Sequence, residues 1–390
     1  MFDRRRGIAR AARQAGDRGR LLTAMAFAAA VLLAPMLGAP AVAAPEKVVI
    51  GAASRSFNPG FSNMWIGIPL GLYGKDIAPE TVGTQGAAEN LQLMLTGQVT
   101  MSTGVQEVLF NATAEGRQLP VVVPCVYLRG LIHRVSVVPG SPIRSYSDLK
   151  GKLVGVPTLA YGGVPYIKFA ARQAGIDPNS IELAAVGDGQ QAATALTSGR
   201  VDALVNADVD VARLLGLGVD LRIVPPPEDM KDAANAYVFA FSKPWYEAHK
   251  KAAAQLLKGM IRAIIVMLEN PEAAVRISYY LHPEAIPAGV PFDNAVESAI
   301  KTIKIRAPVI ERVVGTSNKW CDFPANAWNK YIDMVGLKGK VDPMKFYTDE
   351  LIGQINDFDE PKLRAWARNL KVPATEPKIQ DWLKTLHPPL

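Results

Sequence analysis

The stretch SDLKGKLVGV, residues 147–156, combines a turn with a short buried strand. Asp148 to Lys150 is typical of a turn, and the apolar run 153–156 is short enough to be a strand. A glycine-containing loop, residues 157–163, follows at once and leads into a helical pattern over 164–174. A strand, a glycine turn and a helix start direct several backbone N–H groups at one place, which suits an anionic or polar ligand.

A helix followed by a strand occurs twice in the chain. The first copy spans residues 86–102 and the second spans residues 190–205. Each predicted helix ends at a glycine, and when these glycines are aligned, residues 103–106 correspond to residues 205–208. The same supersecondary unit is therefore expected once in each half of the chain.

Each half also begins with a strand and a polar loop, at residues 47–60 and again at residues 153–163. Loops at the carboxyl ends of parallel strands are where α/β folds bind ligands. Two such lobes would place four polar loops around one cleft, which is a natural ligand site.

The links between the two lobes can be located. Strand 121–127 is followed by strand 133–138, and strand 221–224 is followed, after three prolines, by strand 237–242. One crossing between lobes is expected in each interval. Two crossings of this kind form a hinge that permits closure around a ligand.

We therefore predict an α/β fold with two lobes, two crossings and a helical C-terminal extension. Lobe 1 comprises residues 44–132 and 237–390, including the helical C-terminal region, and lobe 2 comprises residues 133–236. The length and the 49% content of hydrophobic residues are sufficient for two cores.

Outside the repeated unit, the sequence predicts further elements. A helix is expected over residues 66–73 and a weak strand over residues 80–82. Residues 244–268 carry an apolar stripe typical of a long core-packing helix, and Asn270 caps another helix. The tail after residue 372 is expected to lie across the surface. Helix breaks are expected at Pro308, Pro324, Pro343 and Pro361.

Residues 1–43 have the features of a secretory signal peptide. Seven arginines precede an apolar core at residues 21–33, and Ala41-Val42-Ala43 is a small-residue cleavage site, so we expect export to the periplasm with cleavage near Ala43. The segment carries seven arginines against two aspartates, a net charge of +5 out of +7 for the chain. The remaining charge of +2 and the lack of basic, aromatic-rich tracts argue against a nucleic-acid partner.

The two cysteines, Cys125 and Cys321, could pair in an oxidising compartment, but their separation gives no framework signature. Two buried unpaired thiols are the preferred interpretation, with a disulfide as the alternative. The four histidines lack the short spacings of a metal site, so no metal is expected.

The predicted ligand-binding residues come from the loops that follow the strands of both lobes. They combine hydroxyls, amides, aromatic rings and glycine backbone. Arg55 is the candidate to pair an anionic group, because a guanidinium can hold a carboxylate or sulfonate with two hydrogen bonds; a solvated surface position is the alternative. The set is Ser54, Arg55, Asn58, Phe61, Thr103, Gln106, Thr158, Tyr161, Gly162, Gly163, Asn206 and Asp208.

Several of these segments resemble a known family. The similarity is carried by Asp148-Leu149-Lys150-Gly151-Lys152, by Ala174-Gly175-Ile176, by Ser198-Gly199-Arg200-Val201-Asp202-Ala203 and by Phe241-Ser242-Lys243-Pro244-Trp245. Together they resemble the periplasmic substrate-binding proteins of ABC importers for sulfonate, taurine and nitrate, which share a domain with thiamine-pyrimidine synthases (NMT1/THI5-like). The resemblance spans roughly residues 48–268.

The resemblance implies a type II periplasmic binding protein fold and delivery of a small molecule to a permease in the inner membrane. The chain departs from the family at residues 71–74, where Gly-Leu-Tyr-Gly replaces a Gly-Tyr-Phe turn, and in its longer region beyond residue 281. These departures concern the ligand class rather than the fold.

The leading functional hypothesis is a monomeric solute-binding protein for a sulfonate- or carboxylate-type ligand, with no cofactor and no catalytic residue. A pyrimidine synthase on the same fold is the alternative from another class, but such an enzyme would be expected to have a cysteine cluster and an intracellular address. No P-loop, nucleophile elbow or paired His/carboxylate spacing is found. A ligand sensor for a membrane kinase is the third hypothesis, because sensing uses the same closed, ligand-filled shape.

Overall fold

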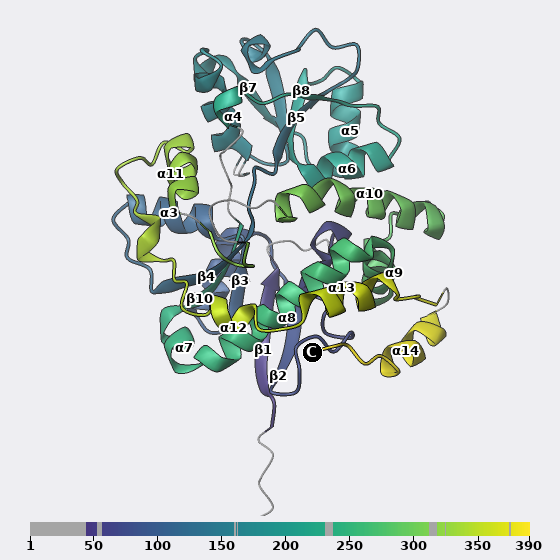
Figure 1. The fold of residues 1–390 in the computed structure, drawn as a ribbon. Coiled ribbons are helices and arrows are strands. Elements are labelled where there is room, and N and C mark those ends of the chain that lie inside the picture. The colour runs from purple at the N-terminus through teal and green to yellow at the C-terminus, as the bar shows by residue number, and fades with distance from the viewer. Residues whose placement is uncertain are drawn as a thin grey trace, which may run out of the picture. The chain divides into compact units, whose positions relative to one another are not determined.

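The computed structural model describes residues 44–52, 57–159, 161, 163–230, 237–311, 318–323, 325–373 and 376–390. The predicted signal peptide lies outside these residues, so its cleavage stays a prediction. The strands of the described chain form two five-stranded sheets (Figure 1).

Sheet one has parallel strands on one side and an antiparallel strand within it. Its order is β2, β1, β3, β10, β4, in which β1 pairs in parallel with β2 and β3, while β10 runs antiparallel to β3 and β4. The bounds are β1 Glu46–Ala52, β2 Ile77–Gly83, β3 Met101–Thr103, β4 Val121–Leu128 and β10 Tyr237–Ser242.

Sheet two repeats this arrangement with a different part of the chain. Its order is β7, β6, β8, β5, β9, in which β6 pairs in parallel with β7 and β8, and β5 runs antiparallel to β8 and β9. The bounds are β5 His133–Val137, β6 Leu153–Val156, β7 Glu182–Ala185, β8 Ala203–Ala207 and β9 Arg222–Val224. Since β5 and β10 occupy equivalent positions, the prediction of two similar α/β lobes is confirmed.

The antiparallel strand of each sheet is the strand that directly follows a crossing. The chain leaves sheet one after β4 and enters sheet two at β5, and it leaves sheet two after β9 to return at β10. Both crossings therefore fall in the predicted intervals, residues 129–132 and 225–236. Hinge motion at these crossings stays a prediction.

The repeated helix-strand unit is also confirmed. Each copy runs from helix to strand and into a second helix, α2-β3-α3 in lobe 1 and α5-β8-α6 in lobe 2. Gln106 and Asp208, which the sequence aligned, are each the first residue of the helix that follows the strand. The helices are α2 Ala87–Leu95, α3 Gln106–Ala114, α4 Gly163–Gln173, α5 Gly189–Thr197 and α6 Asp208–Gly216.

The turn before β6 is a short 3-10 helix, η2 (Tyr146–Leu149). Asp148 caps it, because its carboxylate accepts hydrogen bonds from the backbone N–H groups of Arg144 and Ser145, each at 2.9 Å. Gly151 follows at a φ of +72°, a left-handed conformation that glycine adopts without strain. The predicted turn, strand and helix thus occur in this order.

Two predicted helices, over residues 66–73 and 244–268, differ from the structure. Residues 66–73 form successive turns after η1 (Pro59–Met64) rather than a helix. The helix predicted over 244–268 is interrupted at His249 and forms α7 (Lys243–Ala248) and α8 (Lys250–Glu269). His249 stacks on Trp245 and its Nδ1 lies 2.7 Å from a carboxylate oxygen of Glu46, contacts that hold the break.

The apolar stripe of α8 packs in the core, as predicted. Its residues Leu256, Leu257, Met260, Ile261, Ile264 and Ile265 are completely buried. The next helix, α9 (Pro271–Leu281), begins as expected, because the Asn270 side chain accepts a hydrogen bond from the backbone N–H of Ala273.

The C-terminal region contacts both lobes. Helix α10 (Phe292–Glu311) packs against α6 of lobe 2 and also against α8, α9 and η1 of lobe 1 (Figure 1). Helix α11 (Ala325–Met334) contacts α4. The remaining elements are η3 Pro178–Ser180, η4 Glu228–Met230, η5 Pro283–Ala285, η6 Pro343–Lys345, α12 Ile352–Ile355, α13 Glu360–Arg368 and α14 Glu376–Lys384.

Prolines interrupt the C-terminal helices less than predicted. Pro343 and Pro361 stand in the first turn of η6 and α13, as expected of helix starts. Pro308 instead lies inside α10, so the break predicted there is wrong. Pro308 and Lys304 are both exposed, so water can satisfy the carbonyl that loses its partner. Pro324 lies outside the described residues.

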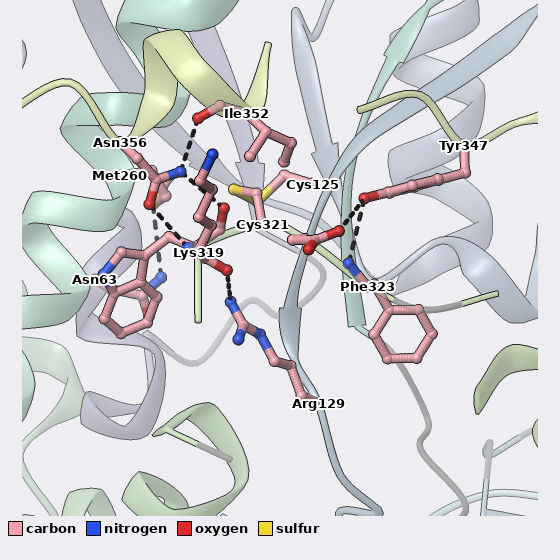
Figure 2. The surroundings of a disulfide bond; sticks show 12 residues. Asn63, Cys125, Arg129, Met260, Lys319, Cys321, Phe323, Tyr347, Ile352 and Asn356 are labelled. Carbon is pink, nitrogen blue, oxygen red and sulfur yellow. Dashed lines mark hydrogen bonds between the residues drawn. A yellow bond between two sulfur atoms is a disulfide. The ribbon is translucent and has the colours of Figure 1, made fainter. Parts of the chain in front are cut away.

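A disulfide ties the C-terminal region to sheet one. Cys125 of β4 is bonded to Cys321, so the preferred prediction of two unpaired thiols is wrong. The Arg129 guanidinium donates to the carbonyl of Lys319 at 2.8 Å, and the Tyr347 hydroxyl accepts from the Phe323 N–H at 3.2 Å (Figure 2). These bonds fix the chain on both sides of Cys321. The sequence could not show that residues 196 positions apart would meet.

Candidate functional site

A cleft of about 980 Å³ is lined by both lobes. Its walls are the segments that follow the parallel strands β1, β2, β3, β6, β7 and β8, with additional residues from the two antiparallel strands. This is the position predicted from the loop pattern, at the carboxyl ends of parallel strands. The lining residues include Phe61, Thr84, Gly86, Glu89, Glu107, His133, Tyr161, Asp188, Asp210, Arg213 and Tyr237.

The predicted site residues divide into three groups. Asn58, Phe61, Gln106, Thr158 and Tyr161 line the cleft. The second group, placed nearby but outside the lining, is Thr103, Gly163, Asn206 and Asp208. The third group lies outside the described residues and comprises Ser54, Arg55 and Gly162. A role in ligand binding stays a prediction for every member.

The start of η1 is held by a side-chain cap. The Asn58 Oδ1 accepts a hydrogen bond from the backbone N–H of Gly60 at 2.9 Å, which starts η1 and places Phe61 at the cleft wall. Asn58 therefore has a structural function in addition to its position in the lining.

Thr103 has a structural function below the cleft. It is completely buried, and its hydroxyl donates a hydrogen bond to the carbonyl of Gly51 at 2.9 Å, which joins β3 to β1. The neighbouring Gly104 has a φ of +68°, and a Cβ there would lie 2.0 Å from the Tyr237 ring. Glycine at this position allows Tyr237 to reach the cleft.

Asp208 is half of a buried ion pair. Both its side chain and that of Arg306 on α10 are at most 1% exposed, and the guanidinium donates from Nε and Nη2 to the Asp208 Oδ1, the Nε contact being 2.8 Å. Burial opposes the charge on Arg306, but the carboxylate raises its pKa above the ordinary value. Sequence reasoning missed Arg306, because its partner is 98 residues away.

The same guanidinium lies over an aromatic ring of the cleft wall. The Arg306 Cζ is 4.7 Å from the centroid of the Phe61 ring, within cation–π range. The far C-terminal helix thereby contributes to the support of the cleft. The charge of Arg306 is already neutralised by Asp208, so the pair adds little net charge to the site.

His133, the first residue of β5, is a cleft residue that the sequence did not single out. It is 3% exposed, and burial together with Arg134 and Arg306 lowers its pKa to about 3. The imidazole is therefore neutral at physiological pH. Its ring meets the Tyr161 ring edge to face at a centroid distance of 5.4 Å, and among the described residues its Nδ1 has no hydrogen-bond partner.

Asp210, in the first turn of α6, is the second cleft residue that was missed. Burial is the main cause that raises its pKa to about 6; Asp188 and Asp208 act in the same direction, and Arg306 and Arg213 in the opposite one. In the described chain no side chain forms a hydrogen bond or close ion pair with Asp210. Its signal in the sequence was the Asp-Val-Asp pattern after β8.

Two further properties of the described residues concern metal ions and membranes. They contain no cluster of three or more His, Cys, Asp or Glu side chains that could hold a metal ion. None of their helices combines the length and the hydropathy needed to cross a bilayer.

Solved structures of other proteins have a similar fold. The periplasmic aliphatic sulphonate-binding protein of Escherichia coli is similar with a TM-score of 0.59 and 17% identity, covering 80% of this chain and 100% of that chain. The alkanesulfonate-binding protein of Xanthomonas axonopodis is similar with a TM-score of 0.58 and 14% identity, and the match covers 78% of this chain and 99% of that chain. The nitrate-binding protein of Synechocystis is similar with a TM-score of 0.51 and 13% identity, and the match covers 84% of this chain and 99% of that chain. The chain therefore has the periplasmic binding protein fold.

The family follows from the sequence. The model of the family described as NMT1/THI5 like matches residues 74–274, a little over half of the chain. The chain belongs to this NMT1/THI5-like family, as its motifs indicated. Among curated proteins, no sequence matches it.

Proposed function

We propose that this chain is an extracytoplasmic solute-binding protein, which captures a small organic molecule in the cleft and delivers it to an ABC permease in the inner membrane. The observation that carries the proposal is the cleft itself. It is bounded by both lobes, it joins aromatic rings to polar groups, and it lies beside two crossings between lobes.

The proposed activity is binding without turnover, by a monomer. The fold neighbours named for a ligand are binding proteins. Among the described lining residues, no hydrogen bond joins a nucleophilic side chain to a base. The imidazole of His133 is too weakly basic, with a pKa of about 3, to act as a general base near neutral pH. Export behind residues 1–43 is part of the same proposal.

The predicted preference for a sulfonate or carboxylate depended on Arg55, which lies outside the described residues. Among the described lining residues Arg213 is the sole Lys or Arg, and its guanidinium lies 3.7 Å from a carboxylate oxygen of Asp188. The described lining thus offers an anionic solute no Lys or Arg that is free of a carboxylate partner.

A thermal-shift screen of residues 44–390 tests the proposal. The panel contains sulfonates, carboxylates, amines, neutral alcohols and pyrimidines, and each solute is recovered afterwards and identified by mass spectrometry. We expect a class of solute to stabilise the protein by about 2.7 kcal/mol at one hundred times its dissociation constant, and to be recovered unchanged. Conversion of a pyrimidine precursor to product would overturn the proposal in favour of the enzyme.

A further inference from the structure

Helix α10 is attached to lobe 1 at several points. It packs against η1, α8 and α9 of that lobe. Near the end of α10, the Val309 carbonyl accepts a hydrogen bond of 2.9 Å from the backbone N–H of Arg129, the first residue of the first crossing. Beyond α10, the disulfide holds Cys321 on β4. Helix α10 is therefore expected to move with lobe 1, so that opening of the cleft would separate α10 from α6 of lobe 2.

The contact between α10 and α6 includes buried apolar side chains. Val209 of α6 is 2% exposed, and it belongs to the same buried cluster as Ile303 of α10 and Met64 of η1. This apolar cluster therefore continues from lobe 1 into lobe 2. Separating α6 from α10 would expose part of its surface to water, which is unfavourable.

One side chain of α10 contacts both lobes at once. The Arg306 guanidinium donates from Nε and Nη2 to the Asp208 carboxylate of α6, in lobe 2. The same guanidinium lies over the Phe61 ring of η1, in lobe 1, with its Cζ 4.7 Å from the ring centroid. Hydrogen bonds between a guanidinium and a carboxylate are strong and directional. Arg306 thereby fixes the orientation of α6 relative to η1.

The three elements η1, α6 and α10 meet at Gly60, beside the cleft. Gly60 belongs to η1 and is buried. A Cβ at this position would lie 2.6 Å from Cγ1 of Val209 in α6 and 3.2 Å from Cγ2 of Thr302 in α10. The first distance leaves no room for a methyl group, so the two lobes are closely packed here.

The cleft is accessible at its rim while this packing is intact. Its lining includes Gln85 of lobe 1 and Thr158 and Asp188 of lobe 2, which are exposed, as well as buried residues such as His133. Its volume of about 980 Å³ is already that of a pocket for a small organic molecule. A solute can therefore enter along the rim without a large separation of the lobes.

We propose that α10 braces the two lobes, with Arg306 as its positioning residue, so that the cleft keeps the width seen in this structure when no solute is bound. The hinge predicted at the two crossings is then expected to move little. This inference goes beyond the proposed function, because it concerns the conformation of the solute-free chain.

The test measures the distance between the lobes without any solute. Spin labels on Lys75→Cys of lobe 1 and Arg200→Cys of lobe 2, both exposed positions, give this distance by double electron–electron resonance. The native cysteines are bonded to each other and fully buried, so they are not labelled. The protein is residues 44–390, unfolded in urea and refolded to remove any solute carried through purification.

Three variants are compared with the labelled chain. Gly60→Ala inserts a methyl group between η1 and α6, and Arg306→Met removes the guanidinium. The control is Gly353→Ala in α12, where an added Cβ meets no atom within 4 Å. Circular dichroism verifies that each variant is folded. Gly60→Ala keeps the ion pair, so the test does not depend on whether Arg306→Met folds.

We expect one narrow distance distribution for the labelled chain and for Gly353→Ala, and a shift to longer distances or a second, longer population for Gly60→Ala and Arg306→Met. A second, longer population in the labelled chain itself would overturn the inference. A folded Gly60→Ala or Arg306→Met variant with an unchanged distribution would also overturn it. The proposed function would survive either result, because it is tested by the solute screen.

Discussion

At the scale of single residues, the ion pair between Asp208 and Arg306 connects the first turn of α6 to the C-terminal region. Both side chains are almost completely buried. Two charges buried in this way are stable only as a pair, because either one alone would have no water and no partner. The pair also supports the ring of Phe61 at the cleft wall.

Breaking this pair should be costly. We expect Asp208→Asn to lower the free energy of unfolding by about 3–5 kcal/mol, because it leaves the Arg306 charge buried and unpaired. Urea denaturation of Asp208→Asn, of Arg306→Met and of the double variant measures the loss of unfolding free energy. The loss in the double variant should be smaller than the sum of the losses in the two single variants. The control is Lys301→Met on the same helix, whose pair with Glu297 is exposed and should contribute little to stability. Equal losses in Asp208→Asn and the control would contradict this account.

His133 should make the protein sensitive to acid. Its pKa is lowered from 6.5 to about 3 in the folded chain, so below pH 6.5 the unfolded chain takes up a proton that the folded chain does not. Stability is therefore lost as the pH falls from 6.5 towards 3. Between pH 7 and pH 5 this loss amounts to about 2 kcal/mol.

His133→Gln removes this proton uptake, so its stability should fall less than that of the unaltered chain over the same pH interval. Urea denaturation at both pH values measures the difference, with the exposed His387→Gln as control. The explanation is wrong if the variant and the unaltered chain lose the same free energy.

At the scale of elements, the sequence predicted best where local signals agreed with the tertiary fold. Residues 86–106 and 190–208 each contain an apolar helix face, a closing glycine and a short strand, and both units formed as expected. Predictions failed where a tertiary contact decided the outcome. The break at His249 depends on Trp245 and Glu46, and Pro308 is tolerated because it faces solvent.

Cleft residues could likewise be predicted only where a local sequence signal existed. Asn58, Phe61, Gln106, Thr158 and Tyr161 were found because the loop after each strand is a local signal. His133 and Tyr237 were missed as cleft residues because they enter on antiparallel strands, which the loop rule does not cover. Arg306 could not be inferred, since no local pattern connects α10 to Asp208.

The disulfide between Cys125 and Cys321 fixes the segment before α11 to β4. Replacing both cysteines by serine should lower the free energy of unfolding by about 2–4 kcal/mol, because the bond closes a long loop in the unfolded chain. Urea denaturation with and without reductant measures the loss. Reductant should leave the serine variant unaffected. A reduced chain, verified by mass, with an unchanged unfolding midpoint would contradict the prediction.

At the scale of the whole molecule, α10 and the disulfide make the C-terminal region a connection between the lobes. Helix α10 packs on α6 of lobe 2 and on α8 and α9 of lobe 1, and α11 reaches α4. The sequence predicted that the entire C-terminal region belongs to lobe 1, whereas in the structure this region also contacts lobe 2.

Because of these connections, the two lobes should unfold together. Calorimetry of residues 44–390 is expected to give one transition, with a calorimetric enthalpy equal to the van't Hoff enthalpy. Two separated transitions would show that each lobe is stable alone and that α10 does not couple them.

The central claim is that the cleft between the lobes holds the solute. A crystal structure of residues 44–390 with the strongest stabilising solute from the screen tests it most directly. We predict one solute per chain in the cleft, in contact with Phe61, Gln106 or Tyr161 from the loops of both lobes. A solute bound elsewhere, or a chemically altered solute in the cleft, would contradict the account.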